Sequence, residues 1–184
     1  MGLFHKLHYA AVTLTWLAAA GVAFLGWQYR QSFTPAVDWA RAIAITKGFK
    51  QEISGELRGT ADRILDETSF RLKTTNGALA TVRLTGIQAR SLSSATTREQ
   101  ADQAVAARRL LGELVLSNEV RVEISHVQQP GAVLGLAWVG ETNVNLALVR
   151  KGVARANTEF MRGLPLDFRY ALLRTDRLSA GVSP

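Results

Sequence analysis

The sequence predicts a small α+β barrel domain that follows one apolar, membrane-spanning segment. Three observations lead to this prediction. Residues 9–29 are almost free of polar side chains, and the chain after residue 52 contains two groups of short stretches in which apolar and polar residues alternate. One amphipathic helical stretch, at 98–116, separates the two groups. Short strands on both sides of a single amphipathic helix are typical of a small barrel with helices packed on it.

The composition is that of an ordinary globular protein with a basic surface. Hydrophobic residues make up 47% of the 184 residues and charged residues 20%, which excludes a disordered chain. The chain has no cysteine, so disulfides, thiolate metal sites and cysteine nucleophiles are excluded. None of the 3 histidines forms a pair at metal-ligand spacing in the domain, so we expect no metal or cofactor. The net charge of +7 suits nucleic acid, anionic lipid or an acidic protein, and it is equally typical of a solvated basic surface.

Residues 9–29 are predicted to form an uncleaved transmembrane helix. They carry no charge, and at about 1.5 Å per residue they match a hydrocarbon core of about 30 Å. Tyr9 at one end, with Trp27 and Tyr29 at the other, resembles the aromatic belt of a spanning helix. A cleaved signal peptide would have a shorter apolar core, and a buried core helix would show a polar face. We therefore expect a short tail at 1–8 and a single-pass anchor that contacts membrane lipid.

The residues after the anchor indicate its orientation. Basic residues that follow it outnumber the lysine before it, and they are Arg30, Arg41, Lys47 and Lys50. This bias favours the domain on the cytoplasmic or matrix side of a bacterial or mitochondrial inner membrane. Residues 30–51 are expected to form a linker with a short helix at 32–48, which begins at Thr34 as N-cap and stops at Gly48.

The domain at 52–184 begins with three predicted strands. The stretches 52–60 and 63–73 are expected to be the first two, and 78–87 the third. Residues 74–77 form the turn between the second and third strands, because its Asn-Gly pair tolerates the positive φ angles of a tight hairpin.

The second half of the domain is predicted to contain three helices and two strands. In the helix at 98–116 the apolar residues at helical spacing predict a buried face of Ala101, Val105, Ala106, Leu110, Leu111 and Leu114. A turn at 128–131 joins the two strands, and Gly152 ends the second helix. The two strands are expected at 120–124 and 133–139, and the two later helices at 145–151 and 165–178.

This order of elements resembles the staphylococcal nuclease (thermonuclease) family. The run 145–154, Asn-Leu-Ala-Leu-Val-Arg-Lys-Gly-Val-Ala, is similar to the family's signature after its fifth strand, and 135–139 to that strand. Residues 82–84 match the strand that bears the family's first catalytic arginine, and 120–122 also fit. The resemblance covers about residues 52–182. It implies an OB-fold, a five-stranded Greek-key barrel with about three helices.

The resemblance also implies a chemistry. Family members cleave phosphodiester bonds with a Ca²⁺ ion that carboxylates hold. Two arginines neutralise charge in the transition state, and a glutamate positions or activates water. An anionic transition state needs fixed positive charge, and a hard cation needs oxygen ligands.

The family's motifs are only partly kept at the matching positions. Its Asp-Gly-Asp-Thr motif reads Asp-Glu-Thr-Ser here, so Thr68 stands in the place of the metal-binding aspartate. Arg83 is retained, whereas Gln88 and Ser91 replace a metal carboxylate and the glutamate. Leu134 replaces the second arginine. The resemblance therefore implies a degenerate site without catalysis or metal, at which only Arg83 is retained.

No other catalytic template is present in the sequence. There is no Walker A run, no Gly-x-Ser-x-Gly and no defensible His/Ser pairing, and Glu123 and Glu141 are ordinary surface candidates. The sequence therefore predicts a membrane-anchored, catalytically inactive domain that serves as an accessory or scaffolding subunit among other membrane-protein subunits.

Two other functions are compatible with the sequence. A non-catalytic nucleic-acid-binding OB module is the first alternative, since OB-folds bind single strands through basic grooves and aromatic platforms. It is less favoured, because the aromatic residues of the domain mostly lie where core packing explains them. A divergent Ca²⁺-dependent membrane-bound nuclease is the third hypothesis, and it rests mainly on the resemblance of fold.

Overall fold

The computed structural model describes residues 30–45 and 55–181, with side chains from residue 37 onward. The predicted membrane-spanning segment at 9–29 lies outside these residues. Within the described ranges, no helix is both long and apolar enough to cross a membrane. The chain divides into two units between Trp39 and Ala40.

The first described element is helix α2, Arg30–Ala44, at the boundary between the two units. The expected helix at 32–48 is wrong in its bounds, because α2 already includes Thr34 and ends at Ala44. Thr34 is therefore not the N-cap. The helix also contains Pro35, which has no backbone N–H and therefore costs the helix one backbone hydrogen bond.

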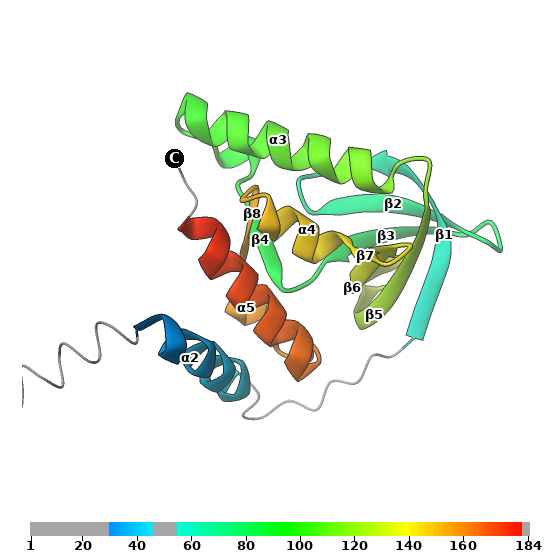
Figure 1. Ribbon diagram of the computed structural model, residues 1–184. Coiled ribbons are helices and arrows are strands. Elements are labelled where there is room, and N and C mark those ends of the chain that lie inside the picture. Colours follow the sequence, from blue (N-terminus) through cyan, green and yellow to red (C-terminus); the bar gives the residue numbers. More distant parts are fainter. Residues whose placement is uncertain (1–29, 46–54, 182–184) are drawn as a thin grey trace, which may run out of the picture. The chain divides into compact units, whose positions relative to one another are not determined.

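The second unit contains a closed five-stranded barrel (Figure 1). Its strands are β1 (Gly55–Ile64), β2 (Ser69–Thr74), β3 (Leu79–Leu84), β5 (Glu119–Gln129) and β6 (Ala132–Val139). They pair in the order β3-β2-β1-β5-β6, and a parallel ladder between β3 and β6 closes the barrel. A short strand β7 (Thr142–Asn143) pairs antiparallel with the end of β6. The predicted α+β class and five-stranded barrel are confirmed.

The first two strands differ from the prediction. Strand β1 continues to Ile64, and a turn at 65–68 separates it from β2, whereas the alternating pattern predicted strands at 52–60 and 63–73. The pairing of β1 with β2 shifts between Ala61 and Arg63. Such an irregularity places two successive residues opposite one, which breaks the period-two pattern that the sequence analysis used.

The third predicted strand ends early. Strand β3 stops at Leu84, and Gly86, with a φ of 75°, turns the chain into β4 (Ile87–Ala89). Strand β4 pairs with β8 (Ala154–Ala156) in a separate two-stranded sheet. The predicted hairpin turn between β2 and β3 is confirmed, and its Gly77 has a φ of 84°.

The three helices of the barrel unit lie close to their predicted positions. They are α3 (Arg98–Val115), α4 (Val144–Arg150) and α5 (Leu166–Ala180). Helix α3 begins after Thr97, whose hydroxyl accepts the N–H of Gln100 at 3.3 Å. Helix α4 ends before Gly152, which has the left-handed φ of 71° expected of a helix stop. Two short 3₁₀ helices, η1 (Leu92–Ser94) and η2 (Thr158–Met161), complete this part of the chain.

The buried face of α3 differs from the predicted one. The residues that α3 buries are Ala104, Ala107, Leu111 and Val115. Of the predicted face only Leu111 is fully buried, and Val105 and Ala106 are exposed. The predicted and the observed buried residues both follow helical spacing, so the 3.6-residue period of the sequence could not distinguish between them. Small alanines on the buried side let the helix lie close to β1 and α4, against which it packs.

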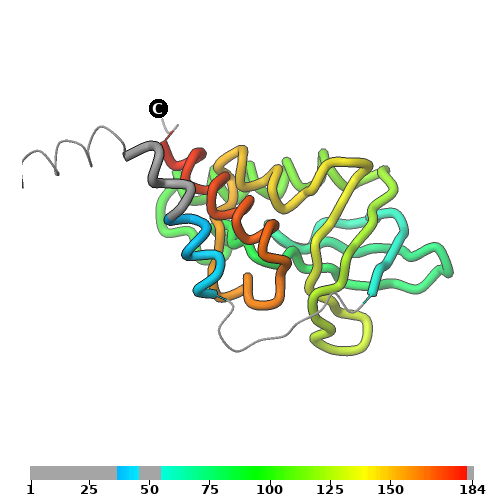
Figure 2. Tube along the Cα trace, turned by 60° about the horizontal axis from the view of Figure 1, so that its bottom comes forward, coloured from blue at the N-terminus to red at the C-terminus, as the bar shows by residue number. Residues whose placement is uncertain are grey.

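The core fills the barrel and the space beneath the helices. Its largest fully buried side chains include Phe70, Leu72, Leu111, Leu136 and Leu148. Helices α4 and α5 run side by side over this core (Figure 2). Apolar area removed from water stabilises such a core by roughly 25 cal/mol per Å².

Candidate functional site

Strand pairing brings three of the five site positions together on the barrel wall. Ser69 is the register partner of Arg83 across β2 and β3, and Arg83 is the register partner of Leu134 across β3 and β6. Thr68 lies directly before Ser69, and its carbonyl accepts the N–H of Leu84 at 2.8 Å. Three of the five positions expected from the resemblance therefore lie on neighbouring strands or next to them, although the sequence separates them widely.

Thr68 and its two acidic neighbours are engaged in local structure. The backbone N–H and the hydroxyl of Thr68 donate to one carboxylate oxygen of Asp66, at 2.8 and 3.2 Å. Glu67 is buried, and its carboxylate accepts the N–H of Leu92 at 3.1 Å. Asp66 thus stabilises the turn between β1 and β2, and Glu67 ties this turn to η1. Sequence reasoning did not assign Glu67 this role, because its partner is distant in the chain.

Arg83 is an exposed cation next to an apolar side chain. Its own side chain is exposed, and Leu134 beside it is half-buried. Within residues 55–181, no carboxylate lies within ion-pair distance of Arg83. A guanidinium in this position can contact an external phosphate, because Arg presents a planar set of N–H donors to oxygen.

Gln88 and Ser91 face other polar side chains. The side-chain oxygen of Gln88 accepts an N–H from Asn157 at 2.8 Å, which ties β4 to the segment after β8. The hydroxyl of Ser91 lies 2.9 Å from that of Ser93. Neither residue supplies a negative charge. The part of the chain that the structure describes contains no group of three or more His, Asp or Glu side chains able to hold a metal ion.

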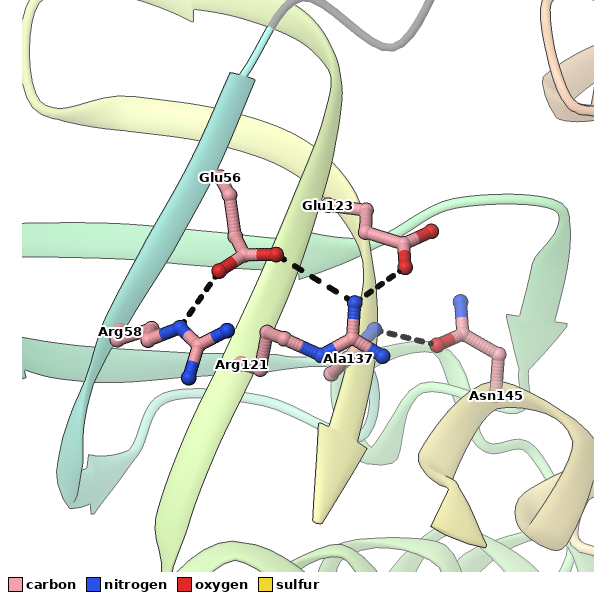
Figure 3. Close-up of polar contacts among 6 residues, drawn as sticks. All are labelled: Glu56, Arg58, Arg121, Glu123, Ala137 and Asn145. Atoms are coloured by element: carbon pink, nitrogen blue, oxygen red, sulfur yellow. Dashed lines mark hydrogen bonds and ion pairs between the residues drawn. The ribbon is translucent and has the colours of Figure 1, made fainter. Parts of the chain in front are cut away.

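The two surface candidates Glu123 and Glu141 are not among these positions. Arg121 on β5 lies between Glu56 and Glu123 and pairs with both (Figure 3). The guanidinium of Arg121 also lies 5.2 Å from the ring centre of Trp138. Glu141 is exposed in the turn between β6 and β7. Glu123 is thus part of a surface ion-pair network.

A buried asparagine holds the barrel wall to α4. Asn145 has no exposed surface, and its side-chain oxygen accepts the N–H of Ala137 at 3.1 Å (Figure 3). Its side-chain nitrogen donates to the carbonyl of Thr85 at 2.8 Å. These bonds link β6 to the end of β3, next to the pair Arg83 and Leu134. The signal in the sequence was a polar residue beside an apolar run, which the prediction used as part of a helix and of the family's signature without assigning it these bonds.

Comparison with known proteins agrees with this geometry. Residues 81–166 match the family model of the staphylococcal nuclease homologues. No curated protein matches the chain. The matched range contains Arg83, Leu134 and the α4 run, whereas β1, β2 and Thr68 precede it. The matched segment and the closed five-stranded barrel together show that the chain contains an SNase-like domain.

Proposed function

We propose that this SNase-like domain is catalytically inactive and acts as a membrane-anchored accessory or scaffolding subunit of a membrane protein assembly. The observation that carries the inactivity is the pairing of Arg83 with Leu134. An apolar side chain stands where the family places its second arginine. The anchor at 9–29 and the retained barrel support the accessory role.

The electrostatics of phosphodiester cleavage support the absence of catalysis. The transition state carries more localised negative charge than the substrate, and fixed cations lower its energy. Loss of one such donor typically reduces the rate by about 10²–10³. Here Leu134 supplies no charge, and Ser91 offers the attacking water no base of suitable pKa.

The residues at the family's metal positions do not fit a calcium site. A Ca²⁺ ion prefers charged oxygen ligands. The hydroxyl of Thr68 donates to Asp66, and the side-chain oxygen of Gln88 accepts from Asn157. Neither residue offers the negative charge that would offset dehydration of the ion. No reaction step is therefore assigned to a metal at this site.

A nuclease assay tests the inactivity. The full chain in mild detergent is incubated with single-stranded DNA at millimolar Ca²⁺, beside the variants Arg83→Ala and Arg63→Ala. Arg63 is a matched control, because it is an exposed arginine on strand β1 away from the site. We expect no metal-dependent cleavage by any of the three proteins. Cleavage that Arg83→Ala abolishes and Arg63→Ala preserves would overturn the proposal.

Membrane extraction and co-purification test the accessory role. Membranes that contain the full chain are washed at alkaline pH, and the retained protein is then purified in mild detergent. We expect the chain to stay in the membrane with its N-terminus intact and to bring a stoichiometric partner. Release by the alkaline wash, or a mature N-terminus near Phe24, would contradict the anchor. Recovery of the chain alone would contradict the accessory role.

Binding of nucleic acid without cleavage is a second candidate, favoured by the exposed guanidinium of Arg83. Phosphate contacts by a few cations give weak, salt-dependent affinity. A labelled single-stranded oligonucleotide that binds the full chain in low salt, and binds Arg83→Ala less tightly than Arg63→Ala, would support this candidate. Equal binding by the two variants would exclude a role for the barrel wall.

A further inference from the structure

A groove between α4 and α5 combines positive charge with apolar surface. We call it the α4–α5 groove, and its lining includes Leu146, Arg150, Lys151, Ala171, Arg174 and Leu178. Its volume is about 780 Å³, within the range of about 300–1,000 Å³ that is usual for ligand sites. The groove lies on the helices and not at the positions that match the family's site, so it is a separate surface.

The three cations of the groove are available to an external anion. Arg150 and Lys151 lie at the end of α4, and Arg174 lies across from them on α5; all three are exposed. Within the described part of the chain, none of them forms an ion pair. Arginine and lysine side chains without internal partners bind phosphate oxygens through charge-assisted hydrogen bonds.

One neighbouring cation, on strand β8, is paired with an acidic residue of α5. This cation is Arg155, and its Nε lies 2.9 Å from a carboxylate oxygen of Asp176. This ion pair neutralises Arg155. The lining of the groove itself therefore carries three cations that form no ion pair within the described residues, a number that suits one anionic headgroup better than the repeated phosphates of a nucleic-acid strand.

The apolar part of the groove calls for an apolar part of the ligand. Leu146 and Ala171 are half-buried, while Leu178 is 58% exposed, which is costly for a leucine in contact with water. Tyr170 is the single aromatic residue of the lining, and it is half-buried. A strand of nucleic acid would need several stacking platforms, whereas one alkyl chain can cover Leu178 and its apolar neighbours.

We propose that the α4–α5 groove binds an anionic phospholipid, with the phosphate between Arg150, Lys151 and Arg174 and an acyl chain against Leu178. Bound in this way, the lipid would hold the helical side of the barrel unit against an anionic membrane surface. The inference deepens the proposed membrane role and rests on it for its biological meaning, while its test does not depend on the anchor.

Hydrogen exchange of the full chain in lipid nanodiscs tests the proposal. The discs contain phosphatidylcholine alone or mixed with phosphatidylglycerol, so the anchor has a bilayer in both cases. We expect slower exchange of the peptides that cover 146–152 and 170–179 only in the discs with phosphatidylglycerol. Retention of the chain in alkaline-washed membranes tests the anchor separately. A failure of the lipid site can therefore be distinguished from a failure of the anchor.

Charge-matched variants test whether lipid binding depends on the cations of the groove. The triple variant Arg150→Gln, Lys151→Gln, Arg174→Gln should bind short-chain phosphatidylglycerol about a hundredfold more weakly, since each basic residue near an anionic surface contributes about a factor of five. The control variant Arg63→Gln, Lys73→Gln, Arg98→Gln removes the same charge from exposed positions outside the groove and should bind as the unmodified chain does. An equal loss of lipid affinity in both variants would show that binding depends only on net charge, and it would overturn the proposed site.

Two further ligands distinguish the chemistry. Leu178→Asn should weaken binding of short-chain phosphatidylglycerol but leave the weak binding of inorganic phosphate unchanged, because only the lipid reaches the apolar surface. Equal affinity for phosphate and lipid would overturn the lipid assignment. A single-stranded oligonucleotide that protects 146–152 and 170–179 when phosphatidylglycerol does not would overturn it in favour of nucleic acid.

Discussion

Arg83 and Leu134 are register partners in the parallel ladder that closes the barrel. An arginine at position 134 would therefore stand beside the first guanidinium. The two would then form the pair of cations that the family uses. Leu134 itself supplies no charge at this place in the ladder.

Leu134→Arg tests what the second cation can restore. We expect this variant to bind a single-stranded oligonucleotide more tightly than the unmodified chain in low salt, because one more guanidinium faces the phosphates. It should still lack Ca²⁺-dependent cleavage, since Thr68, Gln88 and Ser91 are unchanged. Fluorescence anisotropy and a gel assay measure the two effects. Cleavage by the single variant would show that the remaining residues suffice for catalysis.

Asn145→Ala should lower the free energy of unfolding by roughly 2–4 kcal/mol. The substitution leaves the N–H of Ala137 and the carbonyl of Thr85 without their buried partner, and each unsatisfied group costs about 1–3 kcal/mol. Urea unfolding followed by tryptophan fluorescence measures the change. Asn118→Ala is the control, because Asn118 is exposed and its side chain donates to the carbonyl of Leu114 alone. A loss as large in the control would contradict a special role for Asn145.

The stability of the domain should fall in acid partly through two exposed carboxylates. Hydrogen bonds from Arg71 hold the pKa of Asp62 below its usual value, and a hydrogen bond from Arg58 does the same for the pKa of Glu56. A carboxyl with a lowered folded-state pKa stabilises the fold above its unfolded pKa, and this contribution is lost as the pH falls through the folded pKa.

The double variant Asp62→Asn, Glu56→Gln should therefore show a shallower decline of stability below about pH 5 than the unmodified chain. The effect is small, since both carboxylates are exposed to solvent. Thermal unfolding across this pH range checks the prediction, with Glu141→Gln as an exposed control in a turn. Identical pH profiles for the double variant and the unmodified chain would contradict it.

Gly59→Ala should destabilise the barrel by about 3 kcal/mol, because a Cβ at this position would lie 2.1 Å from the carbonyl oxygen of Lys73 on β2. The two strands would have to separate. Gly55→Ala on the same strand is the matched control, since its Cβ would meet only Ile124 Cδ1 at 3.7 Å. Equal melting temperatures for the two variants would contradict the close approach of β1 and β2.

Local signals in the sequence predicted the parts of the fold that depend on local backbone geometry. Asn76-Gly77 marked the β2–β3 hairpin, and Gly152 marked the end of α4, because positive φ angles select such residues. The irregular pairing between Ala61 and Arg63 escaped prediction, since it depends on how β1 meets β2 and not on the alternation within either strand. The face of α3 escaped it too, because alanines fit either side of that helix.

The candidate site was predictable only through the family resemblance. Nothing local relates Arg83 to Leu134, since the contact arises from the parallel pairing of β3 with β6. The α4–α5 groove was missed for a similar reason. Arg174 lies on a different helix from Arg150 and Lys151, so in the sequence these cations read as part of a scattered basic surface.

Closure of the barrel also sets when the domain can fold during synthesis. Strand β1 pairs with β5 through contacts such as Gly55 with Ile124, and β3 reaches its partner β6 only after α3 has been made. Pairings between such distant segments slow folding. Strands β1, β2 and β3 therefore keep two unpaired edges until the ribosome has synthesised the second half of the domain. A chaperone that covers those edges is expected to raise the yield of folded protein more than one that acts after release.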